Sequence, residues 1–320
     1  METLSEVNEC HEFDVVLYHD GCNDGLAAAW IMEETAANPH FRTVGVSHDE
    51  EPPTVDVYGQ QVALVDFCFP PEQMREIMEV AESVKVYDHH TSAERYLEEL
   101  PDDIVGVFDK ERSGARITWD VFGPNEPPTK LVKYIEDRDL WRNKYPDSKA
   151  VVEWVSKIPR TTDAFRTANQ LLEDNIDFVL TQGRNMYELK DEITDLLAQG
   201  AQPIILFGKS GLVQRGSGDV ASLLGNKLAE QSGNGFAVVW DWDDEEGIKL
   251  SFRATDDGPD VSKFAEELGG GGHPNASGAH VPEEKIQTTN NQVVFSYVPE
   301  EKHFQSTDRT IILKKDYYDT

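Results

Sequence analysis

In the first half of the chain, segments with the apolar pattern of strands alternate with segments that have the apolar pattern of helices. Short apolar runs typical of strands occupy residues 14–20, 62–67 and 84–90. The segments 25–36 and 71–82 between them carry apolar residues at helical spacing, and the second opens with proline, which is common in the first turn of a helix. Strands that alternate with helices predict a parallel sheet covered by helices, so we expect a doubly wound α/β domain.

The second half opens with a longer helical pattern and then changes to strands. Helical spacing covers residues 163–199 and stops at Gly200 and Pro203. Ser217 is placed to cap a helix over residues 220–230. Further strands are predicted at residues 203–208, 211–216, 236–242 and 248–254, with short β runs at 292–298 and 310–315. We therefore expect a first domain over 1–185, a helical linker over 186–202 and a smaller mixed α/β domain over 203–320.

The composition limits the kinds of molecule that the protein is expected to bind. The 320 residues include 60 Asp and Glu against 29 Lys and Arg, a formal net charge of -31. Such a surface repels polyanions, so tight binding to long duplex DNA is not expected. Because 39% of the residues are hydrophobic, the acidity marks a folded surface and not a disordered chain.

The sequence predicts a soluble, cytoplasmic protein with no membrane partner. The N-terminal residues lack a basic segment followed by an apolar one, and nowhere do about 18 apolar residues run together. The three cysteines, Cys10, Cys22 and Cys68, form no CxxC pair, which fits a reducing compartment and indicates no structural zinc site.

Two candidate sites follow the first two strands. The turn Tyr18–Gly25 carries Asp20, Cys22 and Asp24 at alternating positions, so that their side chains could converge on one point. Taken alone, this turn also fits a polar connection in which Asp24 caps the next helix. Asp66 follows the second apolar run and likewise fits either a ligand or a helix cap.

The third strand ends in the most specific cluster, Asp88-His89-His90. Two adjacent histidines behind an aspartate supply one imidazole as a metal ligand and leave a second one for acid chemistry. In open α/β sheets, the carboxyl ends of strands are where ligands bind. The sequence therefore predicts a site at this edge of the sheet.

Two later segments add candidates. Residues 136–141 hold several carboxylates and Arg138 behind the strand-like run 131–135, and they fit metal ligands or a solvated charge run. The four glycines of residues 269–272 stand directly before His273 and would let backbone N–H groups approach an anion. Ser113 precedes a helical run and fits an N-cap, a phosphate contact, or both.

The ordered set HDGCNDG, VDF, DHH, EDRD and GGGGHPNASGA resembles the DHH/DHHA1 phosphoesterase superfamily, in particular its oligoribonuclease (nano-RNase-like) DHH phosphohydrolase branch. The resemblance extends to about Val281. It implies an N-terminal DHH domain and a C-terminal DHHA1 domain. These motifs are specific for the family and much less so for the substrate.

The resemblance implies a pair of Mn²⁺ ions in the first domain. The implied ligands are His19, Asp20, Cys22, Asp24, a bridging Asp66, His89, and Asp137 or Asp139, with Asp137 preferred because it follows the strand-like run directly. His90, together with Asp88, would be catalytic and polarise the phosphate or protonate the leaving oxygen. The implied substrate contacts are Arg253, Gly269, Gly270, Gly271, Gly272, His273, Arg138 and Ser113.

Cys22 departs from the family pattern, in which many members have a carboxylate at this position. A thiolate is softer than a carboxylate and prefers metals such as Zn²⁺, Fe²⁺ or Co²⁺. Either the metal preference shifts, with Mg²⁺, Co²⁺ or another divalent ion in place of Mn²⁺, or Cys22 does not bind and Asp20 takes up coordination.

The leading functional hypothesis is a metal-dependent phosphodiesterase that trims short single-stranded oligonucleotides to nucleoside 5′-monophosphates. Hydrolysis of a cyclic (di)nucleotide or of polyphosphate is a second interpretation, and the third is a degenerate DHH module that binds nucleotides without catalysis. A small phosphoester is the expected substrate class, and a homodimer is a possibility that the resemblance raises. The sequence does not choose between RNA and DNA.

Overall fold

The computed structural model describes residues 12–47, 51–243, 247–281, 286–289, 292–296 and 310–314. The chain divides into two compact units, Met1–Tyr187 (unit 1) and Glu188–Thr320 (unit 2). The finer boundaries expected from sequence, at residues 185, 202 and 203, stay a prediction.

Unit 1 is built on a five-stranded parallel sheet with the order β2-β1-β3-β4-β5. The strands are β1 (Val15–His19), β2 (Arg42–Val46), β3 (Gln61–Val65), β4 (Ser83–Asp88) and β5 (Val105–Phe108). The chain steps from β1 outward to β2 and then returns past β1 to β3. The carboxyl ends of β1 and β3 therefore flank the point where the strand order reverses, which is the usual ligand site of such sheets.

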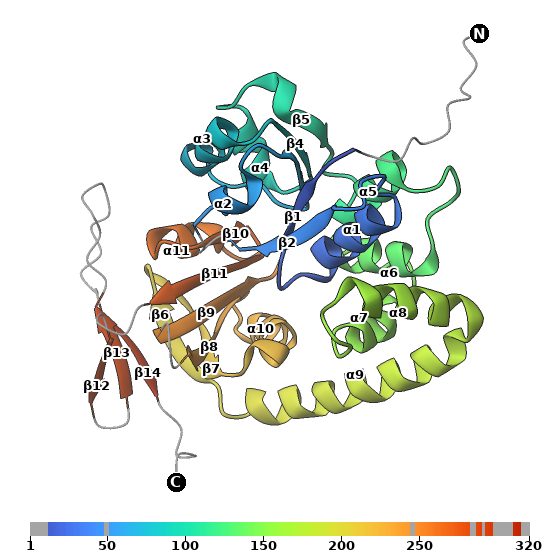
Figure 1. Ribbon diagram of the computed structural model, residues 1–320. Helices are drawn as coiled ribbons and strands as arrows, with labels where there is room; N and C mark the ends of the chain where they lie inside the picture. Colours follow the sequence, from blue (N-terminus) through green and yellow to red (C-terminus); the bar gives the residue numbers. More distant parts are fainter. Residues whose placement is uncertain are drawn as a thin grey trace. The chain divides into compact units, whose positions relative to one another are not determined.

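Helices cover both faces of this sheet (Figure 1). Unit 1 contains α1 (Asn23–Glu34), α2 (Thr54–Val57), α3 (Pro71–Val80), α4 (Thr91–Leu97), the short 3₁₀ turn η1 (Asp102–Ile104), α5 (Gly114–Phe122), α6 (Lys130–Asp139), α7 (Ser148–Val155) and α8 (Thr162–Asp174), and α9 (Ile176–Ala198) runs from unit 1 into unit 2. Alternate residues of β1 face opposite sides. Leu17 packs in the cluster that contains Ile77 of α3, and Val16 packs with Ala28 of α1 and Ile117 of α5.

The run 131–135, expected to be strand-like, is part of helix α6. Leu131, Val132 and Ile135 are all buried there, at spacings of one and four residues. That spacing places them on one side of a helix. Short apolar runs are ambiguous between strand and buried helix, which explains the wrong prediction.

Unit 2 contains a mixed six-stranded sheet with the order β10-β11-β9-β8-β7-β6, in which β7 and β8 are parallel and the other pairs are antiparallel. Its elements are β6 (Gln202–Leu206), β7 (Lys209–Arg215), α10 (Gly218–Gln231), β8 (Phe236–Asp243), β9 (Gly247–Ala254), α11 (Ser262–Glu267), β10 (Gly271–His273) and β11 (Ala276–Val281). Phe236 and Phe252 are fully buried between the sheet and its helices.

A separate three-stranded antiparallel sheet follows, formed by β12 (Ile286–Thr289), β13 (Gln292–Ser296) and β14 (Thr310–Lys314). The parallel sheet with its helices and the mixed sheet after it confirm the expected α/β fold class. Among the helices described, none combines the length and the apolar character needed to cross a membrane.

Candidate active site

Polar side chains gather at the carboxyl ends of three neighbouring strands of unit 1. His19 is the last residue of β1, Asp66 follows β3 directly, and Asp88 ends β4 and is followed by His89 and His90. Because β1, β3 and β4 are adjacent and parallel, these residues meet at one edge of the sheet.

Asp66 lies at the centre of this edge in a strained conformation. Its side chain is fully buried, and its backbone is left-handed with φ 58°. Nε2 of His89 is 3.1 Å from its Oδ1, and Nδ1 of His19 is 3.7 Å from its Oδ2. A left-handed non-glycine residue costs on the order of 1 kcal/mol or more, and such strain concentrates at functional sites. The fold therefore keeps a carboxylate here against its own conformational preference.

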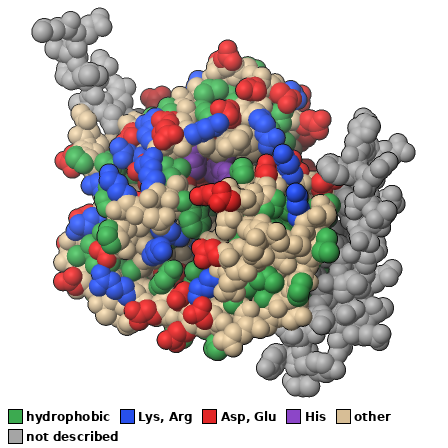
Figure 2. Space-filling model, turned by 180° about the vertical axis from the view of Figure 1, so that it is seen from behind, with side chains coloured by type: hydrophobic (Ala, Val, Ile, Leu, Met, Phe, Trp, Pro, Cys, Tyr) green, Lys and Arg blue, Asp and Glu red, His purple; other side chains and the backbone are tan. Residues whose placement is uncertain are grey.

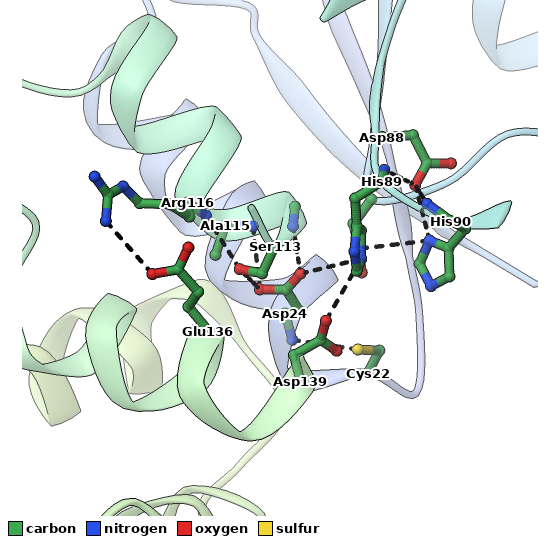
Figure 3. A network of polar contacts seen from close by, with 12 residues as sticks. Cys22, Asp24, Asp88, His89, His90, Ser113, Ala115, Arg116, Glu136 and Asp139 are labelled. Atoms are coloured by element: carbon green, nitrogen blue, oxygen red, sulfur yellow. Dashed lines mark hydrogen bonds and ion pairs between the residues drawn. The ribbon is translucent and has the colours of Figure 1, made fainter. Parts of the chain in front are cut away.

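Asp24 is held by the first turn of α5 (Figure 3). The hydroxyl of Ser113 donates to Oδ1 at 2.7 Å, the N–H of Gly114 donates to Oδ2 at 2.5 Å, and the N–H of Ala115 donates to Oδ1 at 3.1 Å. Ser113 also caps α5 by accepting from the N–H of Arg116. The predicted N-cap is therefore confirmed, and Ser113 is fully buried and also orients Asp24. A contact of Ser113 with substrate stays a prediction.

Asp88 positions His90. Its Oδ1 accepts hydrogen bonds from the N–H groups of His89 at 2.6 Å and His90 at 3.1 Å, and it lies 2.8 Å from Nδ1 of His90. Burial disfavours a charged His90, but the hydrogen bond to Asp88 and the charges of Asp88, Asp66 and Asp139 outweigh it and raise the pKa of His90 to about 10. His90 therefore carries a proton at neutral pH in the protein without metal.

His89 points one ring nitrogen into a group of carboxylates. Besides Asp66, its Nε2 lies 3.5 Å from Oδ2 of Asp139 and 3.8 Å from Oδ2 of Asp24. Figure 3 shows Asp24, His89 and Asp139 directed toward one another. Three carboxylates around one imidazole nitrogen form a donor set that suits a divalent cation.

The structure favours Asp139 over Asp137, contrary to the preference from sequence. Asp137 is turned to a neighbouring loop, where its carboxylate accepts from the N–H groups of Lys144 at 2.7 Å and Tyr145 at 3.3 Å and from the hydroxyl of Ser148 at 2.6 Å. Positions two apart on a helix point to nearly opposite sides, so only one of the two aspartates can face the histidines. A strand would have placed both on the same side, so the predicted strand gave no reason to separate them. The ligand role of either aspartate stays a prediction.

Cys22 lies with the donors, whereas Asp20 does not. The Sγ of Cys22 accepts from the N–H of Asp24 at 3.3 Å as the N-cap of α1 and groups with His19 and Asp66. Burial, together with nearby carboxylates, raises the pKa of Cys22, so the thiol is neutral without metal. Asp20 is exposed and accepts from the N–H of Gly21 at 2.8 Å, and it belongs to none of the donor groups found among the described residues. Its expected role as a ligand stays a prediction.

The donor groups fit divalent cations. Three sets have one ligand atom from each member within 4.8 Å of the others: Asp66, Asp88, His89 and His90; His19, Cys22 and Asp66; and Asp24, His89 and Asp139. In the described part of the chain, Oδ2 of Asp66 and Oδ2 of Asp88 are buried without a hydrogen-bond donor. A bound cation would satisfy such oxygens, which are otherwise costly to bury.

Charge repulsion within the cluster points the same way. Burial and the charges of Asp66 and Asp139 raise the pKa of Asp24. Burial and the charge of Asp66 raise the pKa of Asp139 to about 6. Burial also disfavours a charged Asp66, but the neighbouring imidazoles of His19, His89 and His90 outweigh it and lower the pKa of Asp66. A divalent ion would relieve this repulsion and hold the carboxylates ionised.

Two glycines make room for the donors, a role that the sequence did not indicate for either of them. A Cβ on Gly114 would lie 2.4 Å from Cβ of Asp66, and a Cβ on Gly25 would lie 2.3 Å from the carbonyl oxygen of His19. Glycine next to a capping serine or inside a polar turn is common, so the sequence carried no signal that these positions are crowded by the site.

Arg138, expected to contact substrate, is used in a local turn. Its Nη1 donates to Oδ1 of Asn143 at 2.9 Å, and its guanidinium lies 4.7 Å from the ring centre of Trp141. Burial lowers the pKa of Arg138. A role in binding substrate stays a prediction.

The glycine run of unit 2 is a strand and a turn and not an open loop. Gly271–His273 pairs with β11, and a Cβ on Gly270 would lie 2.0 Å from the carbonyl oxygen of Gly278. Close packing of two backbones therefore requires glycine there. His273 is exposed at the end of β10, and the role of Gly269 to Gly272 and His273 in binding substrate stays a prediction.

Arg253 lies in β9 of the same unit. Its Nη1 donates to its neighbour's carbonyl oxygen, on Phe252, at 2.8 Å, and its Nη2 donates to the hydroxyl of Ser222 at 2.7 Å. Burial lowers the pKa of Arg253. Among the described residues its Nε has no hydrogen-bond partner, so a donor is left for an anion, and the predicted phosphate contact stays open.

The surface is mixed in charge near its histidines. Figure 2 shows histidine side chains reaching the outside of one face, with Lys or Arg and Asp or Glu side chains close to them. In unit 1, His19 and His90 are about a quarter exposed, at 25% and 24%. The donor cluster is therefore buried on the sheet side and accessible through these two rings.

Comparison with known proteins identifies the family. Residues 208–296 match the DHHA1 domain. The uncharacterized protein R106 of Acanthamoeba polyphaga mimivirus is 30% identical over 291 residues, covering 83% of this chain and 67% of that protein. The chain belongs to the DHH/DHHA1 phosphoesterase superfamily. This confirms the resemblance drawn from the motifs and identifies the protein as a metal-dependent phosphoesterase.

Solved structures of other proteins were also compared with this DHH/DHHA1 protein. The pGpG-specific phosphodiesterase PggH from Vibrio cholerae is 11% identical with a TM-score of 0.47, covering 85% of this chain and 94% of that one. RecJ from Thermus thermophilus in complex with Mn²⁺ is 15% identical with a TM-score of 0.48, covering 84% of this chain and 50% of that one.

Proposed function

We propose that this DHH/DHHA1 protein is a Mn²⁺-dependent phosphodiesterase that hydrolyses short oligonucleotides to nucleoside 5′-monophosphates. The observation that carries the proposal is the position of Asp66. It belongs both to the donor group with His19 and Cys22 and to the group with His89, which in turn joins Asp24 and Asp139. One buried carboxylate with ligands on both sides is what a bridged pair of divalent ions requires.

Two such ions, when bound, activate water and stabilise charge on the attacking and leaving oxygens of a phosphoester. The protein's own part is to fix the ligands. Asp24 is oriented by Ser113, Gly114 and Ala115, so its two oxygens cannot rotate away from the cluster. Partners of this kind keep ligand geometry fixed and support metal affinity.

His90 is the proposed general acid. Asp88 holds its Nδ1 at 2.8 Å and so orients the ring, and the negative charge of Asp88 favours the protonated imidazole. A protonated imidazole beside the reacting phosphate can give its proton to the leaving oxygen. Asp88 acts through His90 and is a positioning residue.

The excess of acidic residues supports short substrates. A net charge of -31 repels long polyanions from the surface, whereas a substrate of a few nucleotides meets mainly the metal ions and the residues near them. Arg253 and the residues Gly269 to His273 are the proposed substrate contacts of unit 2.

The test is a panel of substrates with Mn²⁺: pApA, pGpG, 3′,5′-cyclic AMP, cyclic di-AMP and polyphosphate. We expect the fastest hydrolysis for pApA or pGpG, with AMP or GMP as the product, and loss of that activity in Asp66→Asn. Consumption of polyphosphate alone, or of a cyclic nucleotide alone, would overturn the oligonucleotide assignment.

Metal content separates an enzyme from a degenerate binding module. The purified protein loaded with Mn²⁺ and passed over a desalting column should retain close to two ions per chain. Retention well below one ion, together with nucleotide binding and no turnover, would favour the module.

A further inference from the structure

Arg160 lies against the first motif, although it is 138 positions away from Cys22 in sequence. It stands between α7 and α8. Its Nη2 donates to the carbonyl oxygen of Cys22 at 2.8 Å, and its Nη1 donates to Oδ1 of Asn23 at 3.3 Å. Asn23 in turn donates to the hydroxyl of Ser156 at 3.0 Å. These contacts fix the guanidinium beside a residue whose Sγ belongs to the donor cluster.

Among the described residues, no carboxylate is paired directly with the charge of Arg160. Four other arginines adjoin the cluster along the chain. Arg112, Arg116 and Arg142 are each paired with a carboxylate. Arg138 is directed to Asn143 and to the ring of Trp141. The hydrogen bonds of Arg160 go to neutral oxygens instead. In a chain with 60 acidic and 29 basic residues, an exposed arginine of this kind is a feature that needs a reason.

A phosphate group supplies that reason. A guanidinium has five N–H groups, and a planar fork of two matches two phosphate oxygens. The two contacts of Arg160 leave the remaining N–H groups available. An arginine already paired with a carboxylate would have to give up that pair to bind phosphate, whereas Arg160 loses nothing and is already held in place.

We propose that Arg160 binds a non-bridging oxygen of the substrate phosphate beside the metal cluster and so determines affinity for phosphoesters. The proposal rests on the proposed function, since it concerns the substrate of the same site. Arg160 supplies a fixed positive charge that offsets the carboxylates where a phosphate dianion or diester approaches.

The variant Arg160→Gln tests this with pApA and Mn²⁺. We expect KM to rise about 10- to 100-fold, as for loss of a charge-assisted hydrogen bond, with kcat changed much less. The KM of Arg160→Lys, which keeps the charge but loses the planar pair of N–H groups, should lie between the KM of the wild type and that of Arg160→Gln. Arg42→Gln is the matched control. Arg42 is an exposed arginine at the start of β2 in unit 1 and pairs with Asp56. This variant should keep the wild-type KM.

Salt dependence separates charge from a purely structural role. The slope of log KM against log KCl concentration should be shallower in Arg160→Gln than in the wild type, because the complex has lost one screened charge pair. Asn23→Ala removes the neighbouring hydrogen bonds but keeps the charge, so it should leave the slope unchanged. Equal slopes in the wild type and Arg160→Gln would overturn the proposal.

Binding of the product tests Arg160 without catalysis. The Kd of 5′-AMP, measured by calorimetry on the Mn²⁺-loaded protein, should rise in Arg160→Gln, and an unchanged Kd contradicts the proposal. A wild-type protein that hydrolyses none of the panel refutes the proposed function. A wild-type protein that hydrolyses pApA while Arg160→Gln matches it in KM and salt slope refutes only the role of Arg160.

Discussion

Two aspartates in one helix show how much a single position decides at this site. Asp137 and Asp139 have the same side chain and stand two residues apart in α6. Asp137 accepts three hydrogen bonds from a neighbouring loop. Burial disfavours the charged form of Asp137, but these bonds outweigh that effect and lower its pKa. Asp139 faces other carboxylates and has a raised pKa. The fold stabilises the first as an anion, whereas burial and the charge of Asp66 disfavour the charged form of the second.

This contrast predicts different losses in two matched variants. Asp139→Asn removes a metal donor, so we expect retained Mn²⁺ to fall and phosphodiesterase activity to drop roughly 100-fold or more. Asp137→Asn removes the negative charge of a carboxylate that accepts three hydrogen bonds. It should lower the free energy of unfolding by about 1–3 kcal/mol and keep most of the activity. Activity assays, metal analysis and urea denaturation measure both. The reverse pattern would restore Asp137 as the ligand.

Metal affinity should rise with pH. Burial and neighbouring carboxylates raise the pKa of Asp139 to about 6, and the pKa of Cys22 is also raised. Each group must lose its proton to bind a cation, so protons compete with metal below the raised pKa. Below pH 6, the proton on Asp139 alone should weaken Mn²⁺ binding by about tenfold per pH unit. Calorimetry between pH 5 and 8 measures this, and an affinity that is flat over the range would contradict it.

Cys22 should set metal preference more than folding. Its Sγ lies in the donor group with His19 and Asp66, and a thiolate favours Co²⁺ or Zn²⁺ over Mn²⁺. In Cys22→Ala we expect the affinity for Co²⁺ to fall more than the affinity for Mn²⁺, and Mn²⁺-dependent turnover to fall severalfold. Competition titrations with the two metals measure the ratio. If the ratio and turnover match those of the wild type, Cys22 is no ligand.

At the scale of elements, α5 supports the site through its first turn. Ser113 and Gly114 orient Asp24, and the missing side chain of Gly114 leaves space for Asp66. The first turn of α5 therefore binds the carboxylate of Asp24 from α1 and leaves space for the carboxylate of Asp66 at the end of β3. Ligand geometry depends on the packing of α5, a helix that contributes none of the proposed ligands.

Gly114→Ala should damage the site specifically. The added Cβ would meet Asp66 at 2.4 Å, against buried and strained backbone that has little freedom to move. We expect weaker Mn²⁺ binding, lost activity and a loss of about 1–3 kcal/mol in stability. Gly218→Ala is a matched control, because Gly218 also follows a serine N-cap at the start of a helix and its Cβ would meet nothing within 4 Å. Equal effects in the two variants would contradict the prediction.

The sequence predicted β1, β3 and β4 and their polar ends because the signals are local, whereas β2 and β5 of the same sheet were not predicted. An apolar run followed by Asp or His, as at Asp66 and Asp88, shows both the strand and its functional end. The run 131–135 failed because a short apolar segment fits a strand as well as a buried helix face. The cap formed by Ser113 could be predicted from sequence. Its contact with Asp24, and those of Gly114 and Arg160 with the first motif, could not, since these partners lie 89, 90 and 138 positions away.

At the scale of the whole molecule, the excess of acidic residues destabilises the fold of the metal-free protein. With a net charge of -31, repulsion within the folded chain is relieved whenever cations bind or screen the surface. Most of the 60 acidic residues lie outside the donor cluster, so general screening and specific binding both stabilise the fold. Any measurement of metal binding by stability must separate these two effects.

Thermal unfolding with and without Mn²⁺ makes that separation. An ion that binds the folded state alone, at about 100 times its Kd, adds about 2.7 kcal/mol per site, or roughly 5–10 °C in Tm for a unit of this size. Asp66→Asn keeps the shape of the side chain and tolerates the left-handed backbone but removes the shared ligand. It should therefore lose the specific rise in Tm and keep only the smaller rise that KCl of equal ionic strength also gives. If Mn²⁺ raises the Tm of Asp66→Asn as much as that of the wild type, the stabilisation comes from the acidic surface, and Asp66 holds no ion.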